Sequence, residues 1–365
     1  MLKRLFVLIF SIIFLCGCTT SNKEEIVFSS WGSVTETKIL AKIIDSFEVE
    51  NPDIKINFMH IPQNYFQKIH LLFASKTPPD VLFINNLYLP IYENCLIDLT
   101  DFLSDKEEFF SQAVEGLSVN NKILAIPRDI SNQVFYVNLD LVNLEKEEMS
   151  LEDFLHISQE VAKKNIFAVS HEKDIYWALP YLRAFGGGVL DKNLNLIIDD
   201  EKSQNGLNFY NDLVKKYKVA PSKSQVGSLT QAQMFLDEKI AFYLSGRWMY
   251  PIISEKADFN WKVIPFPKGE LSQLYDTSGW AISKDSKHIE ASKKFVKYLS
   301  SEESSEYFTK TGLIIPARKK SSKLLNKEEH NEKVFIEIID SLEKTPVNKN
   351  YRKILDKINL TFLNN

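Results

Sequence analysis

The spacing of apolar residues in the first part of the chain switches repeatedly between two patterns. Short apolar or alternating runs predict buried strands at 26–28, 54–58 and 81–84. Apolar faces that recur every three or four residues predict two helices, one between Ser33 and Asn51 and one over 65–73. Ser33 and Glu36 have the spacing of a capping box at the start of the first helix. Strand, helix, strand, helix, strand is typical of a parallel α/β sheet.

The later part of the chain is richer in helices, and its strands are short. Apolar runs at 123–126 and 134–137 predict strands on either side of Pro127–Asp129. Further strands are predicted at 240–244 and 261–266. Helices are predicted at 151–164, 201–217, 231–236 and 291–299, with two more after residue 332. The run Gly186–Gly188 predicts a turn that follows the aromatic pair Tyr176–Trp177.

A basic and then apolar segment opens the chain. Two basic residues precede an apolar run over 5–15, which is too short to cross a bilayer as a helix and indicates a cleavable signal. Cys18 follows a glycine and precedes polar residues, and this segment resembles the bacterial lipobox. The resemblance implies that 1–17 is a lipoprotein signal peptide, that Cys18 is acylated and that 18–25 is a lipid-anchored tether. The alternative is a generic signal peptide with a cysteine nearby.

Length, charge and cysteine content narrow the class of protein. The 365 residues, less the signal, exceed what one hydrophobic core usually accommodates, so two lobes are expected. Removing the two basic residues of the signal takes the formal net charge from −4 to −6, which gives no electrostatic footprint for nucleic acid. With Cys18 acylated, Cys95 is the only thiol left, so stability must come from packing rather than from a disulfide.

The common catalytic and cofactor motifs are missing from the sequence. The six histidines are scattered, with no pair at the spacing of a helical zinc site. The sequence contains no G-x-S-x-G nucleophile elbow and no P-loop, and Gly186–Gly188 lacks the dinucleotide pattern. We therefore predict no metal, no cofactor and no enzymatic activity. With 48 acidic residues, a glycosidase-like pair of carboxylates is not excluded by sequence.

Aromatic residues give the strongest indication of a ligand. Four tryptophans are predicted to lie in loops or at strand ends, at positions 31, 177, 248 and 280. Sugar rings stack on aromatic faces, while their hydroxyl groups need fixed polar partners. Such partners lie near these tryptophans in the sequence or the predicted fold, namely Ser33, Asn85, Asn86, Asp129, Asn132, Arg247, Asp276 and Ser278. For any single tryptophan, packing in the core is the alternative.

Several phrases, in a fixed order, resemble the extracellular solute-binding proteins of bacterial carbohydrate ABC importers, the maltose-binding-protein-like group. The resemblance covers residues 26 to about 318. The phrases are Phe47–Ile56, Pro79–Val81, Ala125–Pro127 with Phe135–Asn138, Phe185–Gly188, Phe235–Ala241, Ser245–Trp248, Ile264–Pro267, Gly279–Ile282 and Gly312–Pro316. The charged stretch after Asn138 departs from the pattern, since Met149–Leu151 stands where the family usually starts a helix with Pro-Thr-Trp.

The resemblance implies a two-lobed α/β fold of the periplasmic-binding-protein type II, with a ligand cleft between lobes joined by hinge segments. The lobes are expected to comprise 26–131 with 264–314, and 132–263 with 315–365. Trp248 matches an aromatic platform position of the family. The residues expected at the ligand are Trp31, Ser33, Asn85, Asn86, Asp129, Asn132, Tyr176, Trp177, Gly246, Arg247, Trp248, Asp276, Trp280, Arg318 and Tyr351.

The function implied by the resemblance is transport rather than catalysis. We expect a monomeric, extracytoplasmic lipoprotein, anchored to the membrane by lipid, that binds a mono- or oligosaccharide and delivers it to the transmembrane permease subunits of an ABC importer. Closure of one lobe on the other is expected to trap the sugar. The alternatives are a binding protein for a polyamine, a phosphate ester or an iron complex, and a surface-anchored glycoside hydrolase.

Overall fold

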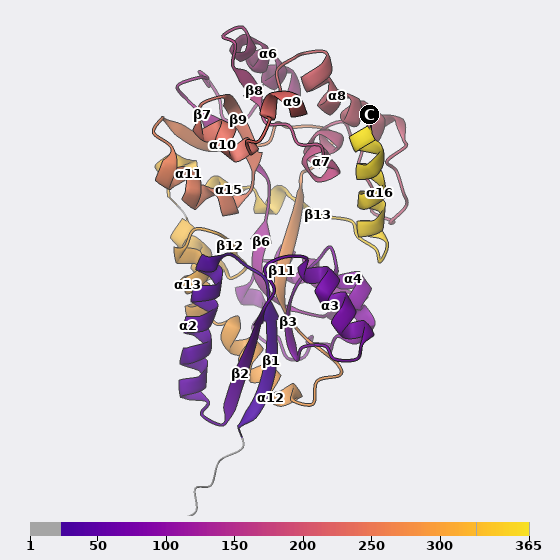
Figure 1. Cartoon of the computed structure of the whole chain (residues 1–365), viewed down its shortest axis with the longest axis vertical. Coiled ribbons are helices and arrows are strands. Elements are labelled where there is room, and N and C mark those ends of the chain that lie inside the picture. Colours follow the sequence, from indigo (N-terminus) through magenta and orange to yellow (C-terminus); the bar gives the residue numbers. More distant parts are fainter. Residues whose placement is uncertain (1–22, 326, 365) are drawn as a thin grey trace, which may run out of the picture.

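The computed structural model describes residues 23–325 and 327–364 (Figure 1). The signal peptide predicted over 1–17, Cys18 and the first residues of the predicted tether lie outside this range. The described residues form two bodies, one above the other in Figure 1, each built on its own β-sheet. In the described part of the chain, no helix has the length and apolar content needed to cross a membrane.

The lower body in Figure 1, which we call the seven-strand lobe, is built on a mixed sheet with the order β12-β6-β11-β3-β1-β2, and β13 pairs with β11. Its strands are β1 (Glu24–Ser30), β2 (Ile54–His60), β3 (Val81–Asn85), β6 (Ile126–Ser131), β11 (Leu274–Ile282), β12 (Ile315–Pro316) and β13 (Glu343–Lys344). Strand β1 runs parallel to β2 and β3, whereas β11 runs antiparallel to β3 and β6. The parallel pairing of the first three strands is as predicted.

Helices surround this sheet and bury its apolar residues. They are α2 (Val34–Glu50), α3 (Tyr65–Ala74), α4 (Leu89–Tyr92), α5 (Ser111–Gly116), α12 (Ile289–Leu299), α13 (Glu302–Lys310) and α14 (Lys319–Ser322). A small hairpin of β4 (Ser118–Val119) and β5 (Lys122–Ile123) lies beside them. The predicted capping box starts α2, because the Ser33 hydroxyl accepts from the Glu36 N–H and a Glu36 carboxylate oxygen accepts from the Ser33 N–H.

The upper body, the four-strand lobe, has a sheet with the order β10-β7-β9-β8. Its strands are β7 (Val134–Asn138), β8 (Phe167–Val169), β9 (Ile240–Ser245) and β10 (Trp261–Pro265). Its helices are α6 (Leu151–Ala162), α7 (Ile175–Ala184), α8 (Glu201–Lys215), α9 (Lys223–Val226), α10 (Gln231–Leu236), α11 (Tyr250–Lys256), α15 (Val334–Glu337) and α16 (Tyr351–Asn364). Short 3₁₀ turns, among them η3 (Arg247–Met249), complete the chain.

The chain passes between the two sheets more than once. It leaves the seven-strand lobe between β6 and β7 and returns between β10 and β11. After β12 it passes to the four-strand lobe again, and β13 then pairs with β11 before α16 packs on α7. The lobes were predicted as 26–131 with 264–314 and 132–263 with 315–365, but β12 and β13 pair within the sheet of the seven-strand lobe. The other boundaries remain a prediction.

Strand β6 differs from the sequence prediction. Pro127–Asp129 was expected to separate two strands, but all three residues lie inside β6. Opposite them, Ser278 pairs with Asp129 and Gly279 pairs with Pro127, so Arg128 is the extra residue of a β-bulge. A bulge accommodates proline within a sheet because the regular hydrogen-bond ladder is interrupted there.

Two tryptophans also lie in elements that the sequence analysis did not assign to them. Trp177 lies in helix α7, although the pattern predicted a loop, because Pro180 within the helix and the following glycines obscured the helical period. Trp280 lies inside β11 rather than at a strand end, and its side chain is fully buried. Both placements bear on the site described below.

Candidate ligand-binding cleft

A cavity of about 770 Å³ lies between the lobes. The seven-strand lobe lines it with the segment before α2, the end of β3 and residues of β6, β11 and β12. The four-strand lobe contributes Tyr176 of α7, Arg247 and Trp248 of η3, and Arg352 of α16. We call this cavity the cleft. It brings together eight of the predicted site residues, namely Trp31, Ser33, Asn85, Asp129, Tyr176, Arg247, Trp248 and Asp276.

Each lobe presents one exposed tryptophan to the cleft. Trp31 follows β1 and packs against Phe83, with ring centroids 4.9 Å apart, and edge-on against Phe66 at 5.6 Å. Trp31 and Trp248 each keep 36% of their surface exposed. Because an aromatic ring that is fixed from behind and open in front is suited to stacking, these two side chains are the candidate platforms for an apolar ligand face.

Gly246 supports Trp248 rather than forming part of the cleft wall. A Cβ atom added to Gly246 would lie 2.0 Å from Cζ3 of the Trp248 ring. Any other residue at position 246 would therefore displace the indole. The carbonyl oxygen of Gly246 accepts a hydrogen bond of 2.9 Å from the Tyr136 hydroxyl, which fixes the backbone of this turn.

Polar side chains of three neighbouring strands share the cleft-facing side of the sheet. In the register of β6 and β11, Asp276 lies opposite Ser131, and Ser278 lies opposite Asp129. Asn85 of β3 lies on the other side of Ser278. Because residues two apart in a strand point to the same face, the five side chains form one polar floor.

An ion-pair cluster at the bulge ties the polar floor to the start of α2. Arg128 Nη2 lies 2.7 Å from Glu36 Oε1, and Arg128 Nη1 lies 3.4 Å from Asp129 Oδ2. The Ser278 hydroxyl donates to Asp129 over 2.7 Å. Burial acts to raise the pKa of Glu36, but the Arg128 charge and the hydrogen bonds from Ser33 outweigh it, so the pKa is lowered. Burial raises the pKa of Asp129, against the opposing charge of Arg128.

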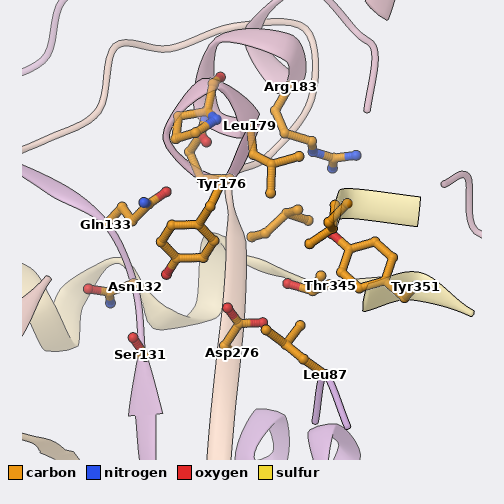
Figure 2. Close-up of a pocket in the computed structure, with 14 residues that line it drawn as sticks. Leu87, Ser131, Asn132, Gln133, Tyr176, Leu179, Arg183, Asp276, Thr345 and Tyr351 are labelled. Atoms are coloured by element: carbon orange, nitrogen blue, oxygen red, sulfur yellow. The ribbon is translucent and has the colours of Figure 1, made fainter. Parts of the chain in front are cut away.

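Asp276 lies where the cleft meets a small second cavity of about 20 Å³ (Figure 2). Figure 2 shows Tyr176 and Tyr351 on two sides of this small cavity, with Asp276 below them. The Asn86 side-chain amide donates to Asp276 over 3.0 Å and itself accepts from the Thr277 N–H. Burial raises the pKa of Asp276, and the hydrogen bond from Asn86 only partly opposes this.

Arg247 is held from behind by a buried carboxylate. Only 3% of the Arg247 side chain and 1% of the Glu332 side chain are exposed, and the two form an ion pair. The guanidinium also lies over the Tyr250 ring, 4.0 Å from its centroid. Among the described residues, Arg247 Nε and Nη1 have no hydrogen-bond partner. These two nitrogens are buried, so they are donors only for a ligand oxygen that enters directly against Arg247.

The sequence of these two lobes matches one protein family. Residues 42–333 match the model of the bacterial extracellular solute-binding proteins. The chain belongs to this family. It is therefore a solute-binding protein rather than an enzyme, as predicted, and its family is extracellular.

Similar proteins of known name are sugar-binding proteins. The solute-binding protein is 22% identical to the galactooligosaccharide-binding protein of Bacillus subtilis over 308 residues, which cover 79% of this chain and 71% of the relative. It is 21% identical over 243 residues to the maltodextrin-binding protein of the same organism, covering 62% of this chain and 58% of the relative.

Solved structures confirm the predicted two-lobed α/β fold. An ABC substrate-binding protein from Listeria monocytogenes in complex with cycloalternan superposes with a TM-score of 0.83 at 24% identity, covering 93% of this chain and 92% of that one. A maltose-bound protein from T. maritima superposes with a TM-score of 0.79 at 23% identity, covering 93% of each chain.

Three of the predicted site residues lie in the protein core or at another surface. Trp280 of the solute-binding protein has no exposed surface and packs edge-on against Phe28 and Phe83, so it lies beneath the cleft. Trp177 packs edge-on against Tyr176 and does not line the cleft. Arg318 pairs with Asp105 and Glu108 on another side of the seven-strand lobe.

Three further predicted residues stand behind the cleft. Asn86 is fully buried and holds Asp276. Asn132 donates to the Phe335 carbonyl oxygen over 3.0 Å, and Tyr351 is 2% exposed; both line only the small second cavity. None of the three lines the cleft itself, and Asn86 fixes the position of a residue that does.

Several cleft residues were not among the predicted site residues, and they include Glu36, Tyr88, Arg128 and Arg352. Glu36 was predicted only as part of the capping box, and in the structure it keeps that role and also pairs with Arg128 in the cleft. Tyr88 lies two residues after the Asn85–Asn86 pair, so its position just after the predicted third strand could have identified it as a site residue. Arg352 had no local signal, because only the return of the C-terminal helix places it there.

Proposed function

We propose that this solute-binding protein binds a carbohydrate in the cleft and delivers it to the permease subunits of an ABC importer. The observation that carries the proposal is the pair Trp31 and Trp248, one exposed ring from each lobe on a single cavity. Sugar rings present a C–H face that stacks on such rings. The cavity of about 770 Å³ lies within the size range of ligand sites.

The charge balance of the cleft favours an uncharged ligand. Among the described residues, the acidic and basic side chains that line it are three carboxylic acids and three arginines: Glu36, Asp129, Asp276, Arg128, Arg247 and Arg352. A polyamine would be favoured by an excess of carboxylates, and a phosphate ester by an excess of cations. The cleft instead offers both donors and acceptors at fixed positions, which suits the hydroxyl groups of a sugar.

The start of α2 is a poor binding site for an anionic ligand. A helix N-terminus attracts anions through its free N–H groups. In this protein the Glu36 carboxylate already accepts from the Ser33 N–H and pairs with Arg128. The site is occupied by the protein's own anion, which weighs against the phosphate-ester alternative.

The relatives support the same choice of ligand. The Bacillus subtilis proteins are named for binding galactooligosaccharides and maltodextrins, and one solved relative holds maltose. We infer an oligosaccharide or monosaccharide of this general class. We further propose that the lobes close on the sugar, since a closed form that binds about a thousandfold more tightly becomes dominant on binding.

The membrane attachment is also a proposal. We infer that Cys18 carries the lipid anchor, that the mature protein is monomeric, and that it lies outside the cytoplasm at the membrane surface. The family, which is extracellular, and the lipobox-like segment before Thr19 support this. Metabolic labelling with palmitate tests it: Cys18→Ala should abolish the label and release the protein from the membrane.

A thermal-shift screen tests the ligand. The protein comprising residues 19–365 is heated with mono- and oligosaccharides, and separately with polyamines, phosphate esters and iron complexes. A ligand that binds only the folded state adds about 2.7 kcal/mol of stability at a hundredfold excess over its dissociation constant. We expect a raised midpoint with one class of sugar. Shifts with only the non-sugar solutes would retain the fold and refute the carbohydrate ligand.

A further inference from the structure

The small second cavity meets the cleft at one part of the cleft wall. Four residues line both cavities, namely Leu87, Ser131, Tyr176 and Asp276. The volume of the small cavity, about 20 Å³, is somewhat larger than the roughly 10–15 Å³ that a water molecule requires. The small cavity is therefore a side pocket of the cleft, with room for one group about the size of a water molecule. We call it the side pocket.

Two tyrosine rings of the four-strand lobe face each other across the side pocket. Tyr176 belongs to α7 and Tyr351 to α16, and Figure 2 shows them on its two sides. Among the described residues, neither tyrosine hydroxyl has a hydrogen-bond partner. Burial raises the pKa of both hydroxyls, so both keep their protons and remain donors. Gln133 also lines the side pocket, and its buried Nε2 atom likewise has no partner in the described part of the chain.

Asp276 supplies an acceptor from the other lobe. It lies on β11 of the seven-strand lobe, and the Asn86 amide donates to one of its oxygens over 3.0 Å. A carboxyl group accepts several hydrogen bonds, so Asp276 retains capacity toward the side pocket. A hydroxyl group placed there accepts from a tyrosine and donates to Asp276, and it thereby joins the two lobes.

The remaining walls favour a neutral group that is partly apolar. Leu179 and Leu355, which are 7% and 2% exposed, line the side pocket together with Leu87. Arg183 also lines it, but this guanidinium is paired with Glu343 at 2.7 Å. Apolar walls with a few fixed polar groups are typical of sites for uncharged organic groups. A CH₂ group that carries a hydroxyl matches both kinds of wall.

We propose that the side pocket takes the hydroxymethyl group of one hexose ring, with its hydroxyl bonded between Asp276 and the facing tyrosines. The proposal rests on the proposed function. The hydroxymethyl group projects farther from a hexopyranose ring than the ring hydroxyls do, and it combines a CH₂ group with a donor and acceptor. Tyr351, which does not line the cleft, is then a specificity-determining residue. The protein favours hexoses over 6-deoxy sugars, because a sugar without this hydroxyl leaves buried polar groups unpaired.

Deoxygenated sugars test the side pocket. The probes are maltotriose, β-1,4-galactotriose and their derivatives in which one hydroxymethyl group at a time is replaced by a methyl group. By titration calorimetry, we expect one derivative to bind the wild type about tenfold more weakly than its parent sugar. Tyr351→Phe should weaken binding of the parent severalfold and leave that derivative nearly unchanged, so the ratio of their affinities should shrink. The melting temperature should change little, since the hydroxyl that is removed has no partner.

The control is Tyr307→Phe. The Tyr307 hydroxyl donates to Glu303 on α13, and Tyr307 lines neither cavity. This variant should leave every affinity unchanged. If the wild type binds a parent sugar and all its derivatives equally, or if Tyr351→Phe leaves the ratio of affinities unchanged, the side pocket is refuted. If neither parent sugar binds the wild type, the proposed function itself fails for these sugars, which is a distinct result.

Discussion

Trp31 and Trp248 line one cavity, although the first follows a strand of the seven-strand lobe and the second follows a strand of the four-strand lobe. Each is packed from behind and keeps 36% of its surface exposed. A ligand that stacks on both rings therefore gains its full contact area only when the lobes lie close together. This relationship links the binding energy to the arrangement of the lobes.

Replacement of the exposed Trp248 and of the buried Trp280 should have different effects. Trp248→Ala should weaken carbohydrate binding by about 1–3 kcal/mol, the scale of an aromatic contact, and leave the melting temperature nearly unchanged. Trp280→Ala should instead lower the free energy of unfolding by about 3–5 kcal/mol, because its ring fills the core. Titration calorimetry and urea denaturation separate the effects. Unchanged affinity in Trp248→Ala with an intact fold would assign that ring a structural role only.

Gly312 offers a test of lobe closure. It has φ +74°, and a Cβ atom there would lie 3.2 Å from Pro251 and 3.3 Å from Arg247, both in the four-strand lobe. Gly312→Val should hold the lobes apart and weaken binding without altering a residue of the polar floor. Calorimetry measures the affinity, and small-angle scattering measures the separation of the lobes.

The matched control is Gly227, which also has positive φ, at +61°, but an added Cβ there would have no atom of the described residues within 4 Å. Gly227→Val should cause similar backbone strain and lower the melting temperature, with the affinity unchanged. Equal loss of affinity in both variants would mean that strain, not lobe contact, explains the effect at position 312.

The buried Arg247–Glu332 pair should be costly to break from one side. Glu332→Ala leaves the Arg247 charge buried without its partner, which costs about 3–5 kcal/mol of unfolding free energy. The exposed helical pair Lys310–Glu306 is the control, and Glu306→Ala should cost about 0.5 kcal/mol or less. Urea denaturation measures both. If both variants lose about the same small amount of unfolding free energy, the buried pair contributes no more to stability than the exposed one.

Asp276 predicts how stability changes with pH. Burial raises its pKa above the ordinary 3.8, so the folded state holds the proton more tightly than the unfolded state. Its contribution is therefore favourable at low pH and is lost as the pH rises through the raised pKa. The asparagine in Asp276→Asn cannot ionise. The melting temperature of this variant should therefore rise relative to that of the wild type as the pH increases.

Asp98 provides a control of opposite sign, because hydrogen bonds from Thr100 lower its pKa. The ionised Asp98 carboxylate adds stability above its ordinary pKa, and this stability is lost as the pH falls. The melting temperature of Asp98→Asn should therefore fall relative to that of the wild type as the pH rises. If the difference in melting temperature between Asp276→Asn and the wild type is the same at every pH, the raised pKa of Asp276 is refuted.

Local pattern predicted most elements of the fold. The apolar face and capping box of α2 were visible because helix period and cap chemistry involve neighbours only. The error at β6 arose from a long-range feature. Pro127 breaks a regular strand, and the bulge at Arg128 that accommodates it depends on the partner strand β11, far away in the sequence.

The site was predicted in part for the same reason. Residues at strand ends, such as Asn85, are placed by a local rule, because parallel strands end at a common edge. Trp280 was misassigned because a glycine beside a tryptophan suggests a loop, whereas Gly279 allows close approach of β6, with Ile126 O only 2.2 Å from an added Cβ. Arg352 reaches the cleft only through the topology of the C-terminal helix.

A crystal structure of residues 19–365 with the sugar that gives the largest thermal shift would locate the ligand site. We predict a sugar ring against Trp31 or Trp248, with hydroxyl groups bonded to Asp129, Asp276 or Arg247. The protein has a second large groove of about 1040 Å³, lined by residues such as Glu93, Arg183 and Lys344. Sugar bound there, with the cleft empty, would refute the assignment of the cleft as the carbohydrate site.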